Sequence, residues 1–201
     1  MRLLRRDFGS SLDALVVGLG NPGPEYAASR HNLGFMVTDR LAGEWSASWR
    51  SKFSGRLAEV RDGDLRLALL QPQTYMNASG RSVAAAMRFY KLEPSALVVV
   101  HDEIDLALGD VRAKFGGGLA GHNGLRSLRE QLGTAEFTRV RIGVGRPERG
   151  EQMPVADWVL RPFPAEVDVT ALVDRGTECT LAVVRDGVDA AMRRFNGTGV
   201  D

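Results

Sequence analysis

The sequence has almost no cysteine, no excess of either charge and no long apolar run. Cys179 is the single cysteine among 201 residues, so no disulfide can form within the chain, as is typical of a reducing compartment. Lysine and arginine number 26 against 25 for aspartate and glutamate, so no overall field favours a nucleic acid or a membrane. No apolar run reaches the roughly 20 residues of a membrane-spanning helix. These absences predict a cytoplasmic protein with no membrane partner.

Several catalytic motifs are missing as well. The sequence contains no Gly-x-Ser-x-Gly elbow and no Gly-x-x-x-x-Gly-Lys-Ser/Thr loop. Its histidines lack the close spacing of a helical zinc motif, although His31, His101 and Asp102 remain able to meet at a metal in the fold. Cys179 falls in a predicted helix, where packing is a commoner role than nucleophilic attack. The sequence therefore favours chemistry without a metal or another cofactor.

Length and hydrophobic pattern predict one α/β domain. The chain is 44% hydrophobic, enough for one substantial core. Residues 1–11 include basic residues but no apolar signal-peptide core, so we expect a disordered lead-in to a single catalytic domain over residues 12–201. Strand-like runs alternate with amphipathic stretches, and Asp62-Gly63 marks a hairpin. The pattern predicts a single three-layer domain with a mixed, mostly parallel central sheet and helices on both faces. We expect strands at 15–17, 57–60, 65–70, 96–100, 111–115 and 140–144, and helices at 32–45, 78–90, 122–131 and within 165–195.

The glycines of residues 18–23 follow the first predicted strand with the Gly-x-Gly-x-x-Gly spacing of a dinucleotide-binding loop. The chemistry argues against that function, because Pro22 offers no N–H to a pyrophosphate and Pro24 interrupts the helix that should begin there. We interpret the loop as a rigid turn that presents Asn21 at the carboxyl end of a strand, where open α/β sheets place their sites. A nicotinamide-dependent oxidoreductase remains an alternative.

Each of the three histidines lies beside an asparagine or an aspartate, in Arg30-His31-Asn32, His101-Asp102-Glu103 and Gly121-His122-Asn123-Gly124. Histidine exchanges a proton near neutral pH, and an aspartate on its far ring nitrogen fixes its tautomer. Asp102 follows a buried strand and is well placed for a site, with a turn cap as the competing interpretation. Asn77 follows another strand, so it should reach the same edge as Asn21. We interpret the histidines as parts of one active site, and the pattern favours a metal-free hydrolase.

Basic residues concentrate over residues 111–149, where the sequence has eight of them and only three glutamates. This local excess of five suits a phosphate backbone. The glycines of residues 116–118 allow a close approach to a ligand, and the helix after them offers free N–H groups. A solvated helix face explains Arg126 and Arg129 well, and explains Lys114 and Arg141, at strand positions, less well. A noncatalytic RNA-binding module is the second alternative. The eight residues are Arg112, Lys114, Arg126, Arg129, Arg139, Arg141, Arg146 and Arg149.

Five sequence motifs, taken together in chain order, are more specific than any one of the patterns above. They read Val-Gly-Leu-Gly-Asn-Pro-Gly-x-x-Tyr-x-x-x-Arg-His-Asn-x-Gly from Val17, Pro-x-Thr-Tyr-Met-Asn-x-Ser-Gly from Pro72, His-Asp-Glu-x-Asp from His101, Gly-Gly-Gly-x-x-Gly-His-Asn-Gly-Leu from Gly116, and Arg-Val-Arg-Ile-Gly-x-Gly-Arg-Pro from Arg139. Together they resemble the signatures of the bacterial peptidyl-tRNA hydrolase family, in order and over most of the chain. The resemblance implies an enzyme that hydrolyses the ester between a nascent peptide and its tRNA, recycling tRNA from stalled or dropped-off translation. We also expect a monomer, because the sequence shows no coiled coil and no obvious apolar patch.

The resemblance also implies roles for ten residues. His31 would be the general base that activates water, and Asp102 would orient it. An ester with an activated ribose leaving group needs little acid help, so one base with amide donors is sufficient. The implied peptide and ester contacts are Asn21, Asn77 and Asn123, with Tyr26 and Met76 lining the site, and the implied tRNA contacts are His122, Lys114 and Arg141.

Overall fold

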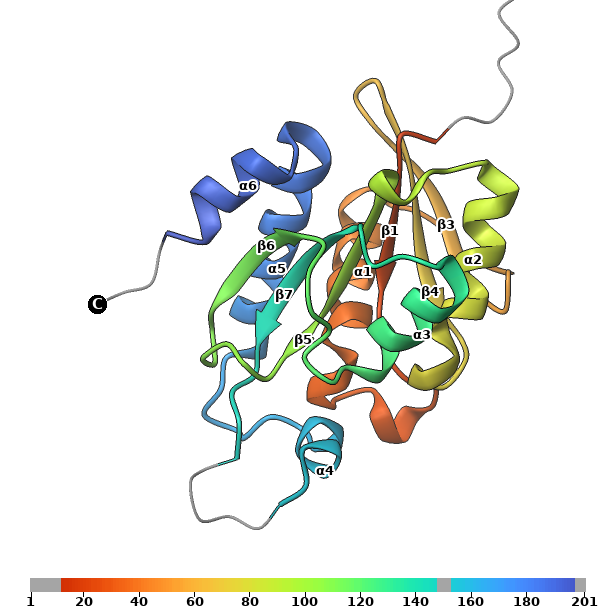
Figure 1. Ribbon diagram of the computed structural model, residues 1–201. Coiled ribbons are helices and arrows are strands. Elements are labelled where there is room, and N and C mark those ends of the chain that lie inside the picture. The colour runs from red at the N-terminus through yellow and green to blue at the C-terminus, as the bar shows by residue number, and fades with distance from the viewer. Residues whose placement is uncertain (1–11, 148–152, 198–201) are drawn as a thin grey trace, which may run out of the picture.

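The computed structural model describes residues 12–147 and 153–197 (Figure 1). Its strands are β1 Ala14–Gly18, β2 Arg50–Lys52, β3 Gly55–Asp62, β4 Leu65–Pro72, β5 Leu97–Glu103, β6 Val111–Phe115 and β7 Thr138–Gly143. They form a sheet in the order β2-β3-β4-β1-β5-β7-β6. The central strands β4, β1, β5 and β7 are parallel, whereas both sides of the sheet end in antiparallel pairs.

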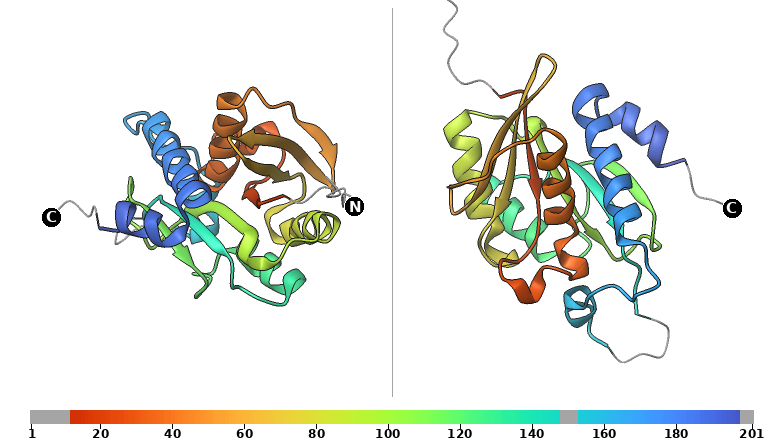
Figure 2. Two further views of the ribbon diagram at one scale, coloured as in Figure 1. Left: turned by 90° about the horizontal axis from the view of Figure 1, so that it is seen from above. Right: turned by 180° about the vertical axis from the view of Figure 1, so that it is seen from behind.

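Helices cover both faces of this sheet. They are α1 Leu33–Glu44, α2 Ser79–Tyr90, α3 Asn123–Leu132, α4 Val155–Leu160, α5 Val169–Asp186 and α6 Val188–Phe195, with 3₁₀ turns η1 Pro24–Tyr26, η2 Arg30–Asn32, η3 Met76–Ala78 and η4 Pro94–Ala96. One face packs against α1, α5 and α6, and the other against α2 and α3 (Figure 2). The predicted three-layer α/β domain with a mixed sheet is confirmed.

The central strands are apolar on both faces because both faces are covered. In β1, Leu15 and Val17 belong to the core under α2 and α3, and Val16 belongs to the core under α1 and α5. The strand β5 alternates in the same way, with Val98 and Val100 on the α1 side. Such near-continuous apolar runs are typical of buried parallel strands.

The predicted elements differ from the structure mainly at their ends. The strand β5 continues to Glu103 rather than ending near Val100, because β7 pairs with it from Val98 to Glu103. Asp102 therefore lies inside the strand, which contradicts its placement just past the strand. The hairpin turn is Gly63-Asp64, one residue later than expected, because Asp62 still pairs with Leu65. Neither β2 nor α4 was among the predicted elements.

Two expectations concern the chain as a whole. The predicted lead-in, residues 1–11, lies outside the described residues. Over residues 12–147 and 153–197, every helix is too short or too polar to cross a membrane.

The glycines of the first loop serve close packing. A Cβ on Gly18 would lie 2.1 Å from the carbonyl oxygen of Gly34, and one on Gly34 would lie 2.3 Å from the backbone nitrogen of Leu19. Only glycine at both positions lets the start of α1 cross the end of β1 at this distance. A Cβ on Gly20 would likewise lie 2.7 Å from Cγ of Phe35. Close packing against the start of α1 therefore accounts for both glycines of the Gly-x-Gly pair without a nucleotide.

Candidate active site

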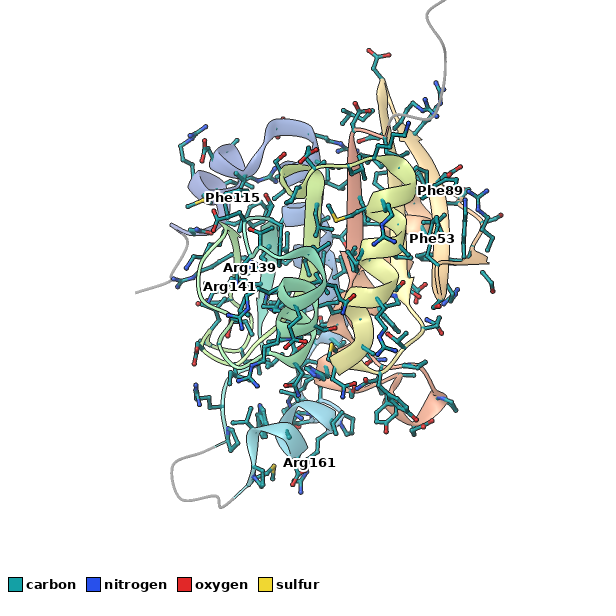
Figure 3. The ribbon with its side chains drawn as sticks, turned by 45° about the vertical axis from the view of Figure 1, so that its right-hand side comes forward. Phe53, Phe89, Phe115, Arg139, Arg141 and Arg161 are labelled. Carbon is teal, nitrogen blue, oxygen red and sulfur yellow. The ribbon has the colours of Figure 1, made fainter. Side chains whose placement is uncertain are left out.

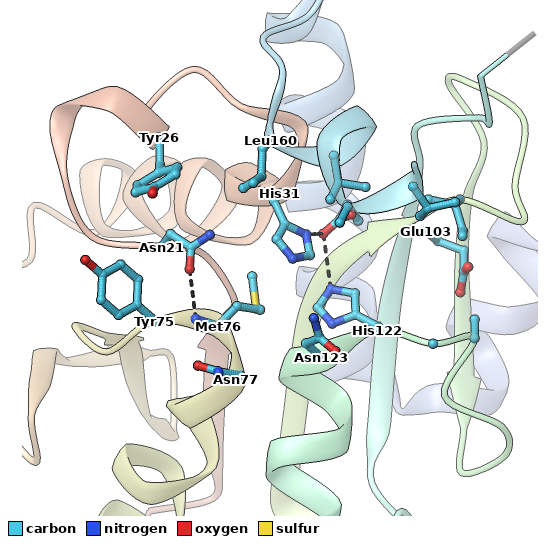
Figure 4. Close-up of a pocket in the computed structure, with 17 residues that line it drawn as sticks. Asn21, Tyr26, His31, Tyr75, Met76, Asn77, Glu103, His122, Asn123 and Leu160 are labelled. Atoms are coloured by element: carbon cyan, nitrogen blue, oxygen red, sulfur yellow. Dashed lines mark hydrogen bonds and ion pairs between the residues drawn. The ribbon is translucent and has the colours of Figure 1, made fainter. Parts of the chain in front are cut away.

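A cavity of about 410 Å³ opens where β1 and β5 end, bounded by η3, the start of α3, and α4 (Figure 4). It brings together eight of the ten predicted site residues from segments far apart in the sequence, whereas Lys114 and Arg141 lie outside it. The eight are Asn21, Tyr26, His31, Met76, Asn77, Asp102, His122 and Asn123.

The predicted pair of histidine and aspartate is in contact. The Nδ1 atom of His31 lies 2.8 Å from Oδ1 of Asp102, and the two residues are only 8% and 2% exposed. Because an ionised carboxylate only accepts hydrogen bonds, Nδ1 of His31 donates and its Nε2 keeps a free lone pair. An imidazole held in this way can take a proton from a water molecule in the cavity.

His122 binds the same carboxylate oxygen from the other side. Its Nδ1 accepts hydrogen bonds from the backbone N–H groups of Gly124 and Leu125, as the N-cap of α3. The ring hydrogen therefore sits on Nε2, which lies 3.1 Å from Oδ1 of Asp102 and donates to it. With both ring nitrogens engaged inside the protein, His122 has no N–H left for a phosphate group.

Asp102 is held ionised by these two rings. Burial alone would raise the pKa of its carboxyl, but His31 and His122 outweigh burial and hold that pKa well below its usual range. A permanently charged Asp102 keeps the tautomer of His31 fixed throughout the neutral pH range.

His101 does not line the cavity, which corrects the interpretation of three histidines in one site. Its side chain is buried, and Nδ1 donates to the backbone carbonyl of Asp102 at 2.6 Å. Its Nε2 has no hydrogen-bond partner within the described residues, and its ring packs edge-on against His122 at 4.9 Å. Burial is the main cause that holds the pKa of His101 well below its ordinary value. His101 is a neutral packing residue behind the site.

Asn21 is oriented by its neighbours so that an amide donor remains available. Its Oδ1 accepts from the backbone N–H of Met76 at 2.8 Å, which leaves Nδ2 as the free end (Figure 4). The side chain of Asn32 holds the backbone of Asn21 by two hydrogen bonds. Oδ1 of Asn32 accepts from the N–H of Asn21, and Nδ2 of Asn32 donates to the carbonyl of Asn21. Asn32 was not among the predicted site residues, although its place directly after His31 was a usable signal. The exposed residue Asn77 lies beside Met76 on the same side of the cavity as Asn21, and the exposed residue Asn123 lies across from them, next to His122 (Figure 4).

One group of residues has the ligand types and spacing of a metal site. The nearest ligand atoms of His31, Asp102 and His122 all lie within 4.8 Å of one another. To bind a cation, however, Nε2 of His122 would have to lose its hydrogen, and Nδ1 would then lose its two backbone donors. The geometry therefore favours a hydrogen-bonded cluster over metal coordination.

The apolar wall of the cavity was missed from the sequence. It consists mainly of α4, with Val155, Ala156, Val159 and Leu160 lining the cavity opposite η3. The local signal was a short apolar stretch that begins after Pro154. Six residues are too few for a clear helical period, so the sequence pattern alone gave little support. Tyr75 and Ile104 also line the cavity without having been predicted.

Lys114 and Arg141 lie on β6 and β7, beside Arg139 and Arg112 in the ladder. Figure 3 shows Arg139 and Arg141 side by side next to the glycine loop. A Cβ on Gly117 would lie 2.8 Å from Nζ of Lys114, so this lysine points along the loop. We call Arg112, Lys114, Arg139 and Arg141 the basic face.

The count of charges along the sequence overestimated the unpaired positive charge near this basic face. Three of the counted arginines are paired with acids that precede the counted window: Arg112 with Asp110, Arg141 with Glu103 and Arg146 with Asp105. Arg139 is 1% exposed and donates to the carbonyl of Gly118. Arg149 lies outside the described residues. Among the basic residues that the structure describes in this window, Lys114, Arg126 and Arg129 form no salt bridge.

Comparison with known proteins gives one consistent family. A family model described as peptidyl-tRNA hydrolase matches residues 15–201. The peptidyl-tRNA hydrolase of Sorangium cellulosum is 54% identical over 186 residues, which span 90% of this chain and 83% of that protein. The peptidyl-tRNA hydrolase of Citrifermentans bemidjiense is 46% identical over 90% of this chain and 97% of its own. The crystal structure of peptidyl-tRNA hydrolase from Acinetobacter baumannii superposes with a TM-score of 0.82 at 36% identity, covering 94% of this chain and 98% of that one.

Proposed function

This chain belongs to the peptidyl-tRNA hydrolase family and hydrolyses peptidyl-tRNA, and we propose that His31 is the general base of that reaction, with Asp102 as its orienting partner. The observation that carries the proposal is the 2.8 Å contact between Nδ1 of His31 and Oδ1 of Asp102 at the wall of the cavity. Neither the nicotinamide-dependent oxidoreductase nor the noncatalytic RNA-binding module is supported.

The reaction follows from the free Nε2 of His31. This nitrogen accepts a proton from a water molecule as the water oxygen attacks the acyl carbonyl of the ester. The bond between the carbonyl carbon and the ribose oxygen of the tRNA then breaks. The proton held by His31 passes to that oxygen, so the products are a peptide carboxylic acid and a tRNA with a free hydroxyl, and both return to use. Asp102 stabilises the transient imidazolium without becoming protonated.

The asparagines provide neutral hydrogen-bond donors around the reacting carbonyl. Nδ2 of Asn21 is the free end of an amide whose orientation Met76 fixes. Donors placed before the reaction are worth most where negative charge develops, because they need no reorganisation. We assign Asn21 to the developing oxyanion, and Asn77 and Asn123 to the polar groups of the acyl chain.

The remaining parts of the cavity divide between peptide and tRNA. Tyr26 and Met76 lie on one side and α4 on the other, and they offer apolar surface to the amino-acid side chain. Lys114 and Arg141 lie on β6 and β7, outside the cavity lining, and we assign them to the phosphates of the bound tRNA. His122 is proposed as a positioning residue for Asp102, since both of its ring nitrogens are engaged within the protein.

The cellular setting follows from the substrate. Peptidyl-tRNA is made during translation, so we propose that the enzyme acts in the cytoplasm. We also propose that it acts as a monomer, because the sequence shows no coiled coil and no obvious apolar patch. Sedimentation of the purified protein at micromolar concentration tests the monomer.

The decisive experiment is release of the acyl group from N-blocked aminoacyl-tRNA in the presence of a chelator. Wild-type protein should release it, and a His31→Ala variant should not, while both bind tRNA. Release by the His31→Ala variant at the wild-type rate would remove His31 from the role of base. Loss of release on addition of the chelator would instead point to a metal at the cluster.

A further inference from the structure

Arg30, the residue before His31, is buried in an unusual way. It is only 4% exposed, yet it forms no salt bridge to an acid in the part of the chain that the structure describes. Instead its Nη1 donates to the backbone carbonyls of Trp158, Arg161 and Pro162, at 3.4, 3.2 and 2.8 Å. These carbonyls lie at the C-terminal end of α4, where unpaired carbonyl groups and the helix dipole favour a cation.

Aromatic and backbone contacts complete the attachment around Arg30. The guanidinium carbon lies 3.9 Å from the ring centre of Trp158 and 5.3 Å from that of Phe163. The backbone N–H of Arg30 donates to the carbonyl of Arg161, and Ser29 forms a β-bridge with Pro162. All of these contacts join the turn that carries His31 to the end of α4.

The helix α4 has few other attachments of its own. Of its six residues only Val159 is buried, and the helix stands beyond the end of the sheet (Figure 1). A second attachment is the bond from Nε1 of Trp158 to the carbonyl of Gly145, at 3.0 Å. Four of the six residues nevertheless form the apolar wall of the cavity. The place of this wall relative to His31 therefore depends on the contacts of Arg30.

We propose that Arg30 is a positioning residue that fixes α4, and with it the apolar wall of the cavity, at a set distance from His31. The proposal rests on the assignment of His31 as base and of the wall to the acyl group. If α4 is displaced, a substrate with a large apolar side chain loses more contact with the wall than a substrate with a small one. The reason is that the contact energy grows with the apolar area covered. Arg30 thus acts on substrate preference as well as on rate.

A conservative variant tests this kinetically. Arg30→Lys keeps the charge but loses the planar group that reaches three carbonyls and stacks on Trp158. With N-blocked phenylalanyl-tRNA, kcat/KM should fall about tenfold, mainly through KM, whereas with N-blocked glycyl-tRNA the loss should be about twofold. Arg161→Ala is the matched control, because only the backbone carbonyl of Arg161 accepts a hydrogen bond from Arg30. The exposed Arg161 side chain repels the Arg30 cation, so its removal should not weaken the attachment. Equal losses on both substrates would overturn the proposal.

A second readout needs no substrate. The chain has three tryptophans, and replacing Trp45 and Trp49 with phenylalanine leaves Trp158 as the only one. In this background, Arg30→Lys should increase the quenching of Trp158 fluorescence by acrylamide, because the indole loses its stacked partner. Unchanged quenching would mean that Arg30 does not hold α4. This result is independent of whether His31 is the base, so the two proposals fail separately.

A disulfide that holds α4 in place of the Arg30 contacts tests whether Arg30 acts by positioning α4 or in another way. Ser29→Cys with Pro162→Cys places two thiols across the observed β-bridge, and Cys179 is buried away from them. In an Arg30→Ala background, the oxidised form should recover the preference for the phenylalanyl substrate, and the reduced form should not. If oxidation leaves the preference as low as reduction does, Arg30 does not act by positioning α4.

Discussion

The cluster of His31, Asp102 and His122, which we propose as the catalytic centre, differs from the basic face in how its charged groups are buried and paired. In the cluster one buried carboxylate oxygen receives two imidazole donors at 2.8 and 3.1 Å, and two backbone N–H groups also hold the ring of His122. On the basic face Lys114 is exposed, and Arg141 is 20% exposed and paired with Glu103. A buried cluster of this kind has one arrangement of protons, because an unpaired charge there is costly.

The difference teaches which property each region controls. In the proposed mechanism the cluster fixes the tautomer and orientation of the base His31, so substitutions in the cluster should change kcat by orders of magnitude. The basic face supplies an electrostatic attraction that salt screens, so its substitutions should change binding by smaller factors. The following predictions test this division, from the largest effect to the smallest.

His31→Ala should lower kcat by about 10²- to 10⁴-fold, the usual worth of a positioned base. Binding of deacylated tRNA should be nearly unchanged, because His31 lies in the cavity and not on the basic face. Single-turnover hydrolysis and filter binding measure the two quantities on one preparation. A large loss of tRNA binding in this variant would break the division between the regions.

Asp102→Asn should lower kcat about a hundredfold, because an amide can hold the ring of His31 in the wrong tautomer. It should also change acid stability. A depressed pKa in the folded state means that Asp102 stabilises the fold above the ordinary carboxyl pKa of about 3.9, and that this stability is lost as pH falls further.

The difference in melting temperature between wild type and Asp102→Asn should therefore narrow as the pH is lowered from 6 to about 3. If Asp102 is merely a structural residue of β5, kinetics should be unaffected and only the melting temperature should change.

Lys114→Ala should raise KM for a full tRNA substrate about fivefold and lower the slope of log K against log salt by about one. A minimal ester that ends at the terminal nucleoside should be hydrolysed as before. Arg141→Ala should lower the slope by less, since the charge of Arg141 is already paired with Glu103.

Lys52→Ala is the matched control for Lys114. It removes a cation from β2, at the opposite edge of the sheet, where Nζ lies 3.6 Å from the ring centre of Phe89 (Figure 3). Equal losses on the full and the minimal substrate would show that Lys114 supports the fold or the cluster.

His101 lies at the boundary of the two regions, behind His122 and opposite Arg141 in the ladder. Its depressed pKa means that its neutral form stabilises the fold above the ordinary value of about 6.5, and that stability is lost as the pH falls below it. His101→Asn keeps a donor for the carbonyl of Asp102 and removes this dependence. Urea unfolding at pH 7.5 and 5.5 should show a smaller decrease for the variant, and an identical decrease would contradict the burial argument.

The sequence by itself determined the parts that depend on local pattern. Continuous apolar runs predicted the central strands, and apolar residues at a spacing of 3.6 predicted the longer helices, because each element buries a face that its own sequence defines. Asn21, Asn77 and Asp102 were predicted at one edge of the sheet, because the carboxyl ends of parallel strands meet there. His31 was grouped with the other histidines by its polar neighbour, and the role of Asn123 was implied by the family resemblance.

Tertiary structure decided what depends on contacts between distant segments. The exclusion of His101 from the site, the second donor from His122 and the pairing of Arg141 with Glu103 all arise where separate strands and loops are brought together. The helix α4 is too short for its own pattern to predict it, and its place is set by Arg30, more than 120 residues earlier in the chain. Such contacts produce no periodic pattern in the sequence. They stabilise the protein only after the sheet has brought the two distant segments together.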